Sequence, residues 1–206
     1  LLTIVGAGGM GKTRLAVQVA QAYIEQTGYE AHFTSLVGIS TTRQVVQSLS
    51  HAFQIDVEAA ANQWETVERL VKGMARRPML LVLDSAESWI NGAEHEFLGL
   101  LNLLTSQLPE LRLLVTSHQP LKAQQEWVYR LGGMSVPAQE EIAPEVALQY
   151  DGVALFVRQA QKADVGFELT AGNVGDVIAL CQQLEGMPLA LELAAAQMGQ
   201  RPLTEL

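Results

Sequence analysis

The sequence predicts an α/β fold, in which a doubly wound parallel sheet of about five strands is followed by a small all-helical domain. Short apolar runs alternate with segments of helical periodicity up to Pro137, a pattern typical of strands buried between helices. After Pro137, helical patterns follow one another with no strand signal between them. With 206 residues, 49% of them hydrophobic and 17% charged, the chain has the composition of a globular protein with a sizeable core. We therefore expect a sheet domain over 1–137 and a helical domain over 138–206.

Each expected element rests on a local signal. The expected strands are Leu2–Val5, His32–Leu36, Met79–Leu83, Leu111–Thr116 and Trp127–Leu131. Apolar spacing of three and four residues predicts helices over about 11–27, from a cap at Thr41 or Thr42, over about 62–76 and over 88–107. In the second domain three helical faces are expected, carrying residues 146–160, 174–184 and 189–196.

The segment between the first strand and the first helix matches G-x-x-x-x-G-K-[ST], the phosphate-binding loop (P-loop) of nucleotide-binding proteins. It consists of Gly6, Ala7, Gly8, Gly9, Met10, Gly11, Lys12 and Thr13. Glycines let the backbone approach a phosphate, and successive N–H groups at the start of a helix attract an anion. Lys12 is expected to reach the β- and γ-phosphates, and the Thr13 hydroxyl to bind Mg²⁺. The sequence therefore predicts a nucleotide site here.

Polar residues follow two of the other expected strands. Asp84 comes directly after an apolar strand, which is where a P-loop protein needs a carboxylate for Mg²⁺, bound directly or through water. Glu87 either orients an attacking water or acts as a base, or else complements the dipole at the start of a helix. The group Thr116-Ser117-His118 either senses a γ-phosphate or caps the next turn. The predicted catalytic residues are thus Lys12, Asp84 and Glu87.

Charge and composition limit the partners. A net charge of −9 argues against a nucleic-acid contact made by this segment, and no apolar run approaches the roughly 18 residues of a membrane span. The one cysteine, Cys181, lies in an apolar helical pattern and is expected in the core. With no secretory leader visible, we expect a cytoplasmic protein. Because the chain starts inside a strand and without Met, we expect it to be a segment of a longer protein.

Four motifs carry a resemblance to a known class. They are GAGGMGKTRLA at the P-loop, LLVLDSAE around Asp84, LLVTSHQPL around His118, and LEGMPLALELAAA from Leu184. In order and spacing they resemble the STAND class of P-loop NTPases, and most closely the NB-ARC-like ATPase module of bacterial LuxR- and AfsR-type multidomain regulators. The resemblance covers essentially the whole chain.

The resemblance implies an ATP/ADP switch that uses Mg²⁺. ADP holds such a module closed, and exchange for ATP opens it and permits self-association. By the same resemblance Ala7 to Thr13 cradle the phosphates, and Arg14 belongs to the start of the following helix. Pro188 is expected near the adenine or the sugar, with Gly186 letting its turn come close.

Two positions depart from the family pattern. His118 stands where the family usually has Arg, and imidazole lacks the fixed forked charge of a guanidinium. Ser85 stands at the second acidic or amide position after the apolar strand. We therefore expect nucleotide binding with slow or weak ATP hydrolysis. The alternatives are an interaction scaffold impaired in nucleotide binding and a stand-alone P-loop phosphotransferase.

Overall fold

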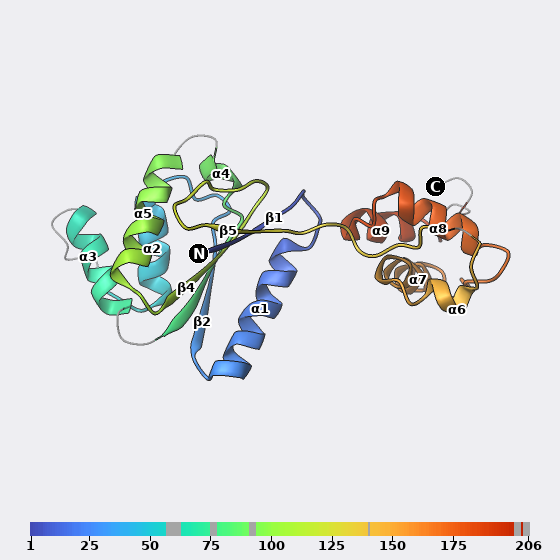
Figure 1. Cartoon of the computed structure of the whole chain (residues 1–206), viewed down its shortest axis with the longest axis horizontal. Coiled ribbons are helices and arrows are strands. Elements are labelled where there is room, and N and C mark those ends of the chain that lie inside the picture. The colour runs from blue at the N-terminus through green and yellow to red at the C-terminus, as the bar shows by residue number, and fades with distance from the viewer. Residues whose placement is uncertain (57–62, 75–77, 91–93, 140, 200–202, 204–206) are drawn as a thin grey trace. The chain divides into compact units, whose positions relative to one another are not determined.

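The computed structural model describes residues 1–56, 63–74, 78–90, 94–139, 141–199 and 203 (Figure 1). These residues contain one five-stranded sheet in the order β2-β3-β4-β1-β5, and every neighbouring pair is parallel. Its strands are β1 (Leu2–Val5), β2 (Glu30–Ser35), β3 (Met79–Asp84), β4 (Leu111–Ser117) and β5 (Trp127–Arg130). All five predicted strands are thereby confirmed, with ends that differ by no more than two residues.

The strand order brings three chain segments to one edge of the sheet. Strand β1 pairs with β4 on one side and with β5 on the other, while β4 also pairs with β3. Because all strands are parallel, the carboxyl ends of β3, β4 and β1 lie next to one another. Ligands of open α/β sheets bind at this edge, where the strand order reverses. The candidate site is therefore fixed by the order of three strands.

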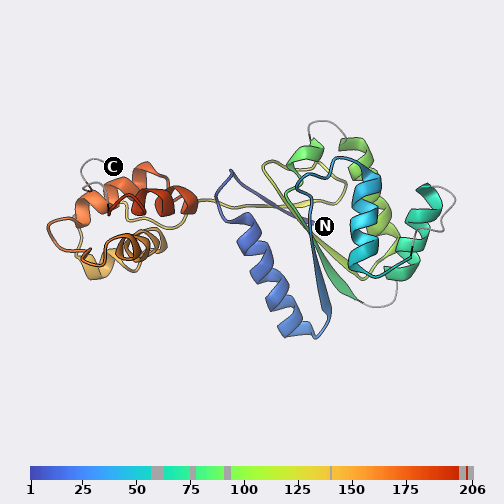
Figure 2. The same ribbon diagram turned by 180° about the vertical axis from the view of Figure 1, so that it is seen from behind.

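Helices cover both faces of the sheet (Figures 1 and 2). On one face α1 (Lys12–Thr27) packs Ala16 against Ile4, Leu80, Val82 and Leu114. On the other lie α2 (Thr42–Ala52), α3 (Gln63–Met74), α4 (Glu87–Ile90) and α5 (Glu94–Gln107), over alternate residues of the same strands. All six side chains of β3 are buried, as the sequence predicts for a strand inside a parallel sheet.

The predicted start of the second helix is confirmed by its N-cap. Thr41 caps α2, its hydroxyl accepting from the Gln44 N–H while the Gln44 side chain accepts from the Thr41 N–H. The single helix expected over 88–107 is described as α4 and α5, and residues 91–93 between them lie outside the described ranges. Residues 62 and 75–76 of the expected 62–76 helix also lie outside them.

Contacts between residues divide the chain into two compact units, Leu1–Gly6 with Lys12–Leu131, and Ala7–Gly11 with Gly132–Leu206. The second unit holds α6 (Pro144–Ala147), α7 (Asp151–Ala163), α8 (Val174–Gln183) and α9 (Pro188–Ala195). The shared helical face predicted over 146–160 is wrong, because α6 ends at Ala147 and α7 begins at Asp151. The Ser135 side chain and carbonyl accept from the Asp151 and Gly152 N–H groups and so supply the start of a new helix.

A close backbone approach in this unit explains one of the glycines in the fourth motif. Gly186 has φ +62° and lies so close to Met134 that a Cβ at this position would collide with the Met134 carbonyl. The Met134 N–H donates to the Gly186 carbonyl oxygen at 2.8 Å, and the Gln182 amide donates to the Pro137 carbonyl at 2.7 Å. Residues 134–137 are thus tied to the turn between α8 and α9. The predicted domain boundary at 137 stays a prediction.

The core of the second unit includes the cysteine. Cys181 is fully buried among residues of α7, α8 and α9, as the sequence predicts. Burial raises the pKa of its thiol to about 12. No helix in the described part of the chain is long and apolar enough to cross a membrane.

Candidate functional site

The P-loop turn has the backbone conformation that its glycines permit. Gly9 and Gly11 have φ angles of +79° and +89°, which L side chains rarely adopt. The Met10 N–H donates to the Ala7 carbonyl at 3.4 Å, and the Gly6 N–H donates to the Ser117 carbonyl at the end of β4. Ala7 and Gly8 are exposed. The motif thus forms a tight turn directly before α1, as the sequence pattern predicts.

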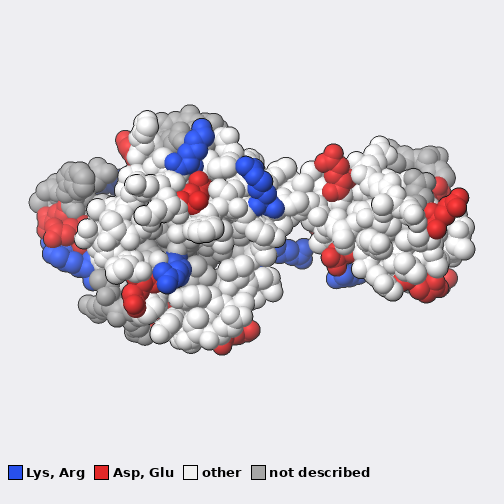
Figure 3. Space-filling view, viewed as in Figure 1, with Lys and Arg blue, Asp and Glu red and all other residues white. Residues whose placement is uncertain are grey.

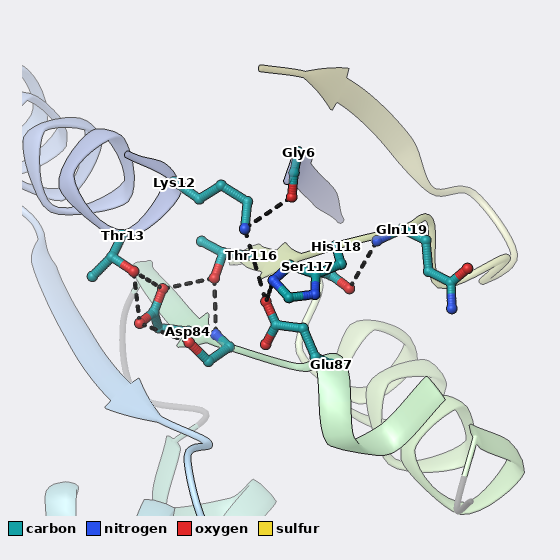
Figure 4. A network of polar contacts seen from close by, with 10 residues as sticks. Gly6, Lys12, Thr13, Asp84, Glu87, Thr116, Ser117, His118 and Gln119 are labelled. Carbon is teal, nitrogen blue, oxygen red and sulfur yellow. Dashed lines mark hydrogen bonds and ion pairs between the residues drawn. The ribbon is translucent and has the colours of Figure 1, made fainter. Parts of the chain in front are cut away.

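Lys12 lies at the first position of α1, and its side chain contacts a backbone carbonyl and a carboxylate (Figure 4). Its ammonium group donates to the Gly6 carbonyl at 2.9 Å and lies 3.9 Å from Oε1 of Glu87. The side chain is only 8% exposed. This burial lowers the pKa of Lys12 from 10.5, while the charges of Glu87 and Asp84 oppose the shift. The lysine is therefore a largely desolvated ammonium group at the start of α1.

Thr13 and Asp84 meet at the carboxyl edge of the sheet. The Thr13 hydroxyl lies 2.9 Å from Oδ1 and 3.0 Å from Oδ2 of Asp84, which is 5% exposed at the end of β3. The sequence predicts both residues as metal ligands, and the fold brings these two oxygen groups from positions 71 residues apart into contact. The sequence predicts the role of each residue, and the structure shows that their side chains are in contact.

Thr116 is a site residue that sequence reasoning did not single out by itself. Its buried hydroxyl donates to Oδ1 of Asp84 at 2.6 Å and accepts from the Ser85 N–H at 2.8 Å. Ser85 has φ +65°, an unusual conformation for a residue with a side chain, and its hydroxyl lies 3.4 Å from Oδ2 of Asp84. A hydroxyl at the end of the strand next to β3 is the sequence signal that identifies Thr116 in retrospect.

Glu87 contacts two basic side chains through one oxygen atom. Oε1 lies 3.9 Å from the Lys12 ammonium nitrogen and 3.4 Å from Nε2 of His118 (Figure 4). Glu87 is 25% exposed and His118 is 56% exposed. The structure therefore brings together Lys12, Glu87 and His118, which the sequence predicts as separate contributors.

The oxygen groups fit Mg²⁺. Mg²⁺ prefers oxygen ligands and is usually bound through one or two carboxylates together with substrate phosphates. Asp84 and Thr13 offer a carboxylate and a hydroxyl that already lie in contact. Among the described residues no group of three or more His, Cys, Asp or Glu side chains is arranged to hold a metal ion. This donor set suits an ion shared with a phosphate chain.

Two further residues were predicted for the site, Arg14 and Pro188. Arg14, the third residue of α1, is exposed. Pro188 opens α9 in the second unit, at the first helical position that proline favours. Its predicted contact with the nucleotide stays a prediction, as does the role of Arg14.

On the face shown in Figure 3, the described Lys and Arg residues are scattered among neutral and acidic ones. They do not gather there into a basic patch of the kind that tracks a phosphate backbone.

The chain is similar to curated mycobacterial proteins. It is 30% identical over 198 residues to a Mycobacterium tuberculosis protein provisionally named as an HTH-type transcriptional regulator, covering 96% of this chain and 20% of that protein. An uncharacterised protein from the same organism is 28% identical over 197 residues, covering 96% of this chain and 45% of the relative. The chain thus spans a fifth to less than half of the length of these relatives.

Solved structures share the fold. Cdc6p of Pyrobaculum aerophilum matches with a TM-score of 0.62 at 14% identity, over 99% of this chain and 55% of that one. A signal transduction ATPase with numerous domains (STAND) and a tetratricopeptide repeat sensor, from Pyrococcus horikoshii, matches with a TM-score of 0.55 at 15% identity, over 92% and 26%. At these identities the similarity shows the fold alone, and it confirms the predicted α/β fold class.

The family model of the NB-ARC domain matches residues 1–107, which include the P-loop, Asp84 and Glu87. That stretch is more than half of the chain and contains β1 to β3 with their helices. The chain belongs to the NB-ARC domain family.

Proposed function

We propose that this chain is an ATP/ADP-binding switch module of a multidomain regulator, and that it hydrolyses ATP slowly. The observation that carries the proposal is the meeting of Lys12, Thr13 and Asp84 at one edge of the sheet, where Lys12 and Thr13 directly follow the glycine-rich motif in the sequence. Glycine-rich backbone, a lysine, a hydroxyl and a buried carboxylate are the groups with which a P-loop binds a nucleotide and its Mg²⁺.

Each residue has a part that follows from its position. The turn from Gly6 to Gly11 offers N–H groups to the phosphates, and Lys12 supplies positive charge to the β- and γ-phosphates. Thr13 and Asp84 would hold Mg²⁺, which when bound neutralises charge on the phosphate oxygens. Thr116 keeps the Asp84 carboxylate in place through its 2.6 Å hydrogen bond. Pro188 and Arg14 are proposed to contact the nucleotide, by the family resemblance alone.

The proposal of slow turnover rests on what stands beside Asp84. Ser85 has a hydroxyl in place of an acid or amide, and a hydroxyl supplies no carboxylate that could activate water. We further propose that nucleotide exchange rearranges the domains and permits self-association of the full-length protein, in the cytoplasm. A mycobacterial relative's name as an HTH-type regulator supports a role in transcriptional regulation.

Calorimetry with Mg-ADP and Mg-ATP tests the proposal. Wild type is expected to bind both, and Lys12→Ala to lose at least about 100-fold in affinity, since each tenfold corresponds to about 1.4 kcal/mol. Lys162→Ala is the matched control, because it removes an exposed lysine in the last turn of α7. It is expected to bind as wild type does.

The same assay separates the alternatives. Absence of binding by wild type at millimolar nucleotide would refute the switch and favour an interaction scaffold. Turnover of many per second in the presence of a phosphoryl acceptor would favour a phosphotransferase. Binding with hydrolysis below about one per minute is the result expected for a switch, since efficient enzymes typically turn over 1–1000 times per second.

A further inference from the structure

One carboxylate oxygen lies between two basic groups of the candidate site. Oε1 of Glu87 is 3.9 Å from the Lys12 ammonium nitrogen and 3.4 Å from the His118 Nε2 atom (Figure 4). Both residues come from elements that end or begin at the phosphate-binding edge, Lys12 after β1 and His118 after β4. A phosphate that entered the site would need the Lys12 ammonium group and could accept a hydrogen bond from the His118 imidazole.

The other acid near Lys12 is engaged differently. Asp84 accepts hydrogen bonds from the hydroxyls of Thr13, Thr116 and Ser85, so its oxygens are directed at neutral donors. Glu87 opens the four-residue α4, too short a helix for its dipole alone to account for the position of the carboxylate. The Glu87 side chain is therefore held by its contacts with Lys12 and His118.

We propose that Glu87 is an internal competitor of the terminal phosphate: its carboxylate contacts Lys12 and His118 and must give them up when a triphosphate binds. The inference rests on the proposed nucleotide-binding function and adds a regulatory element to that site. Because Lys12 faces the β- and γ-phosphates, the competition weakens binding of a triphosphate more than binding of a diphosphate. The affinity of the site is thus set below what its P-loop alone would give.

This role differs from that of a general base. A base acts on water, and its loss lowers the rate of hydrolysis while leaving nucleotide affinity unchanged. A competitor lowers affinity by repelling the incoming charge and by occupying the Lys12 ammonium group, so its removal raises affinity. A gain of affinity is also an outcome that mere damage to the fold does not produce.

The decisive variant is Glu87→Gln, which keeps the size of the side chain and removes its charge. We expect it to bind Mg-ATP at least tenfold tighter than wild type in calorimetry, and Mg-ADP about threefold tighter, with tenfold corresponding to about 1.4 kcal/mol. Glu110→Gln is the control, because it makes the same change of net charge at an exposed residue just before β4, at the opposite end of that strand from His118. The control is expected to match wild type for both nucleotides.

The possible outcomes separate the inference from the function on which it rests. Wild-type binding with unchanged Glu87→Gln affinity and reduced hydrolysis makes Glu87 a base and overturns the inference alone. Weaker binding by Glu87→Gln makes Glu87 a positioning residue for Lys12 and also overturns it. Binding by neither protein refutes both the inference and the proposed function. Glu87→Ala, measured in parallel, is expected to tighten binding in the same direction, which guards against an effect peculiar to glutamine.

Discussion

The Thr116 hydroxyl donates a 2.6 Å hydrogen bond to Oδ1 of Asp84 and ties together the ends of two neighbouring strands. The same hydroxyl accepts from the Ser85 N–H at 2.8 Å, and the Thr116 carbonyl accepts from the Ala86 N–H at 2.9 Å. One side chain therefore holds both the carboxylate and the backbone that follows it.

Thr116→Val is expected to lower the free energy of unfolding by about 2–3 kcal/mol, because a buried carboxylate oxygen loses a donor and a backbone N–H loses its acceptor. Urea unfolding measures the effect. Thr116→Ser keeps the hydroxyl and should retain most of the stability. A loss below about 0.5 kcal/mol for the valine variant would show that this hydrogen bond contributes little.

Asp84→Asn is expected to remove the dependence of nucleotide binding on Mg²⁺, because the neutral amide is a poor ligand for a hard divalent cation. Calorimetry with ADP in Mg²⁺ and in EDTA checks this. Wild type should bind at least about tenfold tighter with Mg²⁺, whereas the variant should bind equally in both. Asp176→Asn, at an exposed position in the first turn of α8, is the control and should behave as wild type. A variant that still responds to Mg²⁺ would remove Asp84 from the metal site.

The stability of the nucleotide-free chain is expected to carry a pH-dependent contribution from Lys12. Burial lowers the pKa of Lys12 below 10.5, so between the lowered value and 10.5 the folded chain binds fewer protons at this group than the unfolded chain does. The contribution of Lys12 to the free energy of unfolding therefore rises as pH rises through that window.

Lys12→Met should lack this rise. Urea unfolding at several pH values up to 10.5 should show wild type gaining stability relative to Lys12→Met as pH increases. Lys162→Met, at an exposed lysine, is the control. The stability difference between wild type and this variant should change less with pH than the difference for Lys12→Met. A constant difference between wild type and Lys12→Met across this range would mean that burial leaves the lysine unaffected.

Much of the site was predictable because its residues follow strands. A buried apolar run that ends in Asp84, and a glycine-rich turn after β1, are local signals whose meaning does not depend on the rest of the chain. Thr13 and Asp84 were each predicted as ligands of Mg²⁺, and the structure shows that their side chains are in contact. Thr116 was harder to recognise, because its role depends on β3 and β4 being neighbours, which periodicity alone does not reveal.

The break between α6 and α7 could not be predicted from helical spacing. Val146, Val153 and Val157 keep a shared apolar spacing, but Ser135, distant in sequence, accepts from the first N–H groups of α7. Likewise the close approach of Gly186 to the Met134 backbone was not predicted, and the expected approach of its turn to a nucleotide stays a prediction. Tertiary hydrogen bonds of this kind leave no trace in a local pattern.

Gly186→Ala is expected to destabilise the chain by about 2–4 kcal/mol, because the new Cβ would meet the Met134 carbonyl and φ is +62°. Thermal or urea unfolding measures this. Gly172→Ala is the matched control, since a Cβ there would contact only the Thr170 hydroxyl at 3.7 Å, an ordinary distance. Equal stability of the two variants would mean that the turn relaxes without cost.

His118→Arg tests whether this position senses the γ-phosphate. A guanidinium carries a permanent, forked charge, so the variant is expected to prefer ATP over ADP by about threefold to tenfold more than wild type does. Calorimetry with both nucleotides and a steady-state hydrolysis assay measure the change. His51→Arg, at an exposed residue of α2, is the control. Unchanged preference and unchanged hydrolysis would count against a sensor at position 118.

The burial of Cys181 has a practical consequence. A fully buried thiol whose pKa is raised to about 12 is almost entirely protonated at neutral pH, and the thiolate is the form that reacts with maleimides and iodoacetamides. It is the only cysteine in the 206 residues. A cysteine introduced at an exposed position can therefore carry a fluorophore or a spin label while the native residue stays in place. A variant with one such label in each unit would report how nucleotide changes the distance between the two labels.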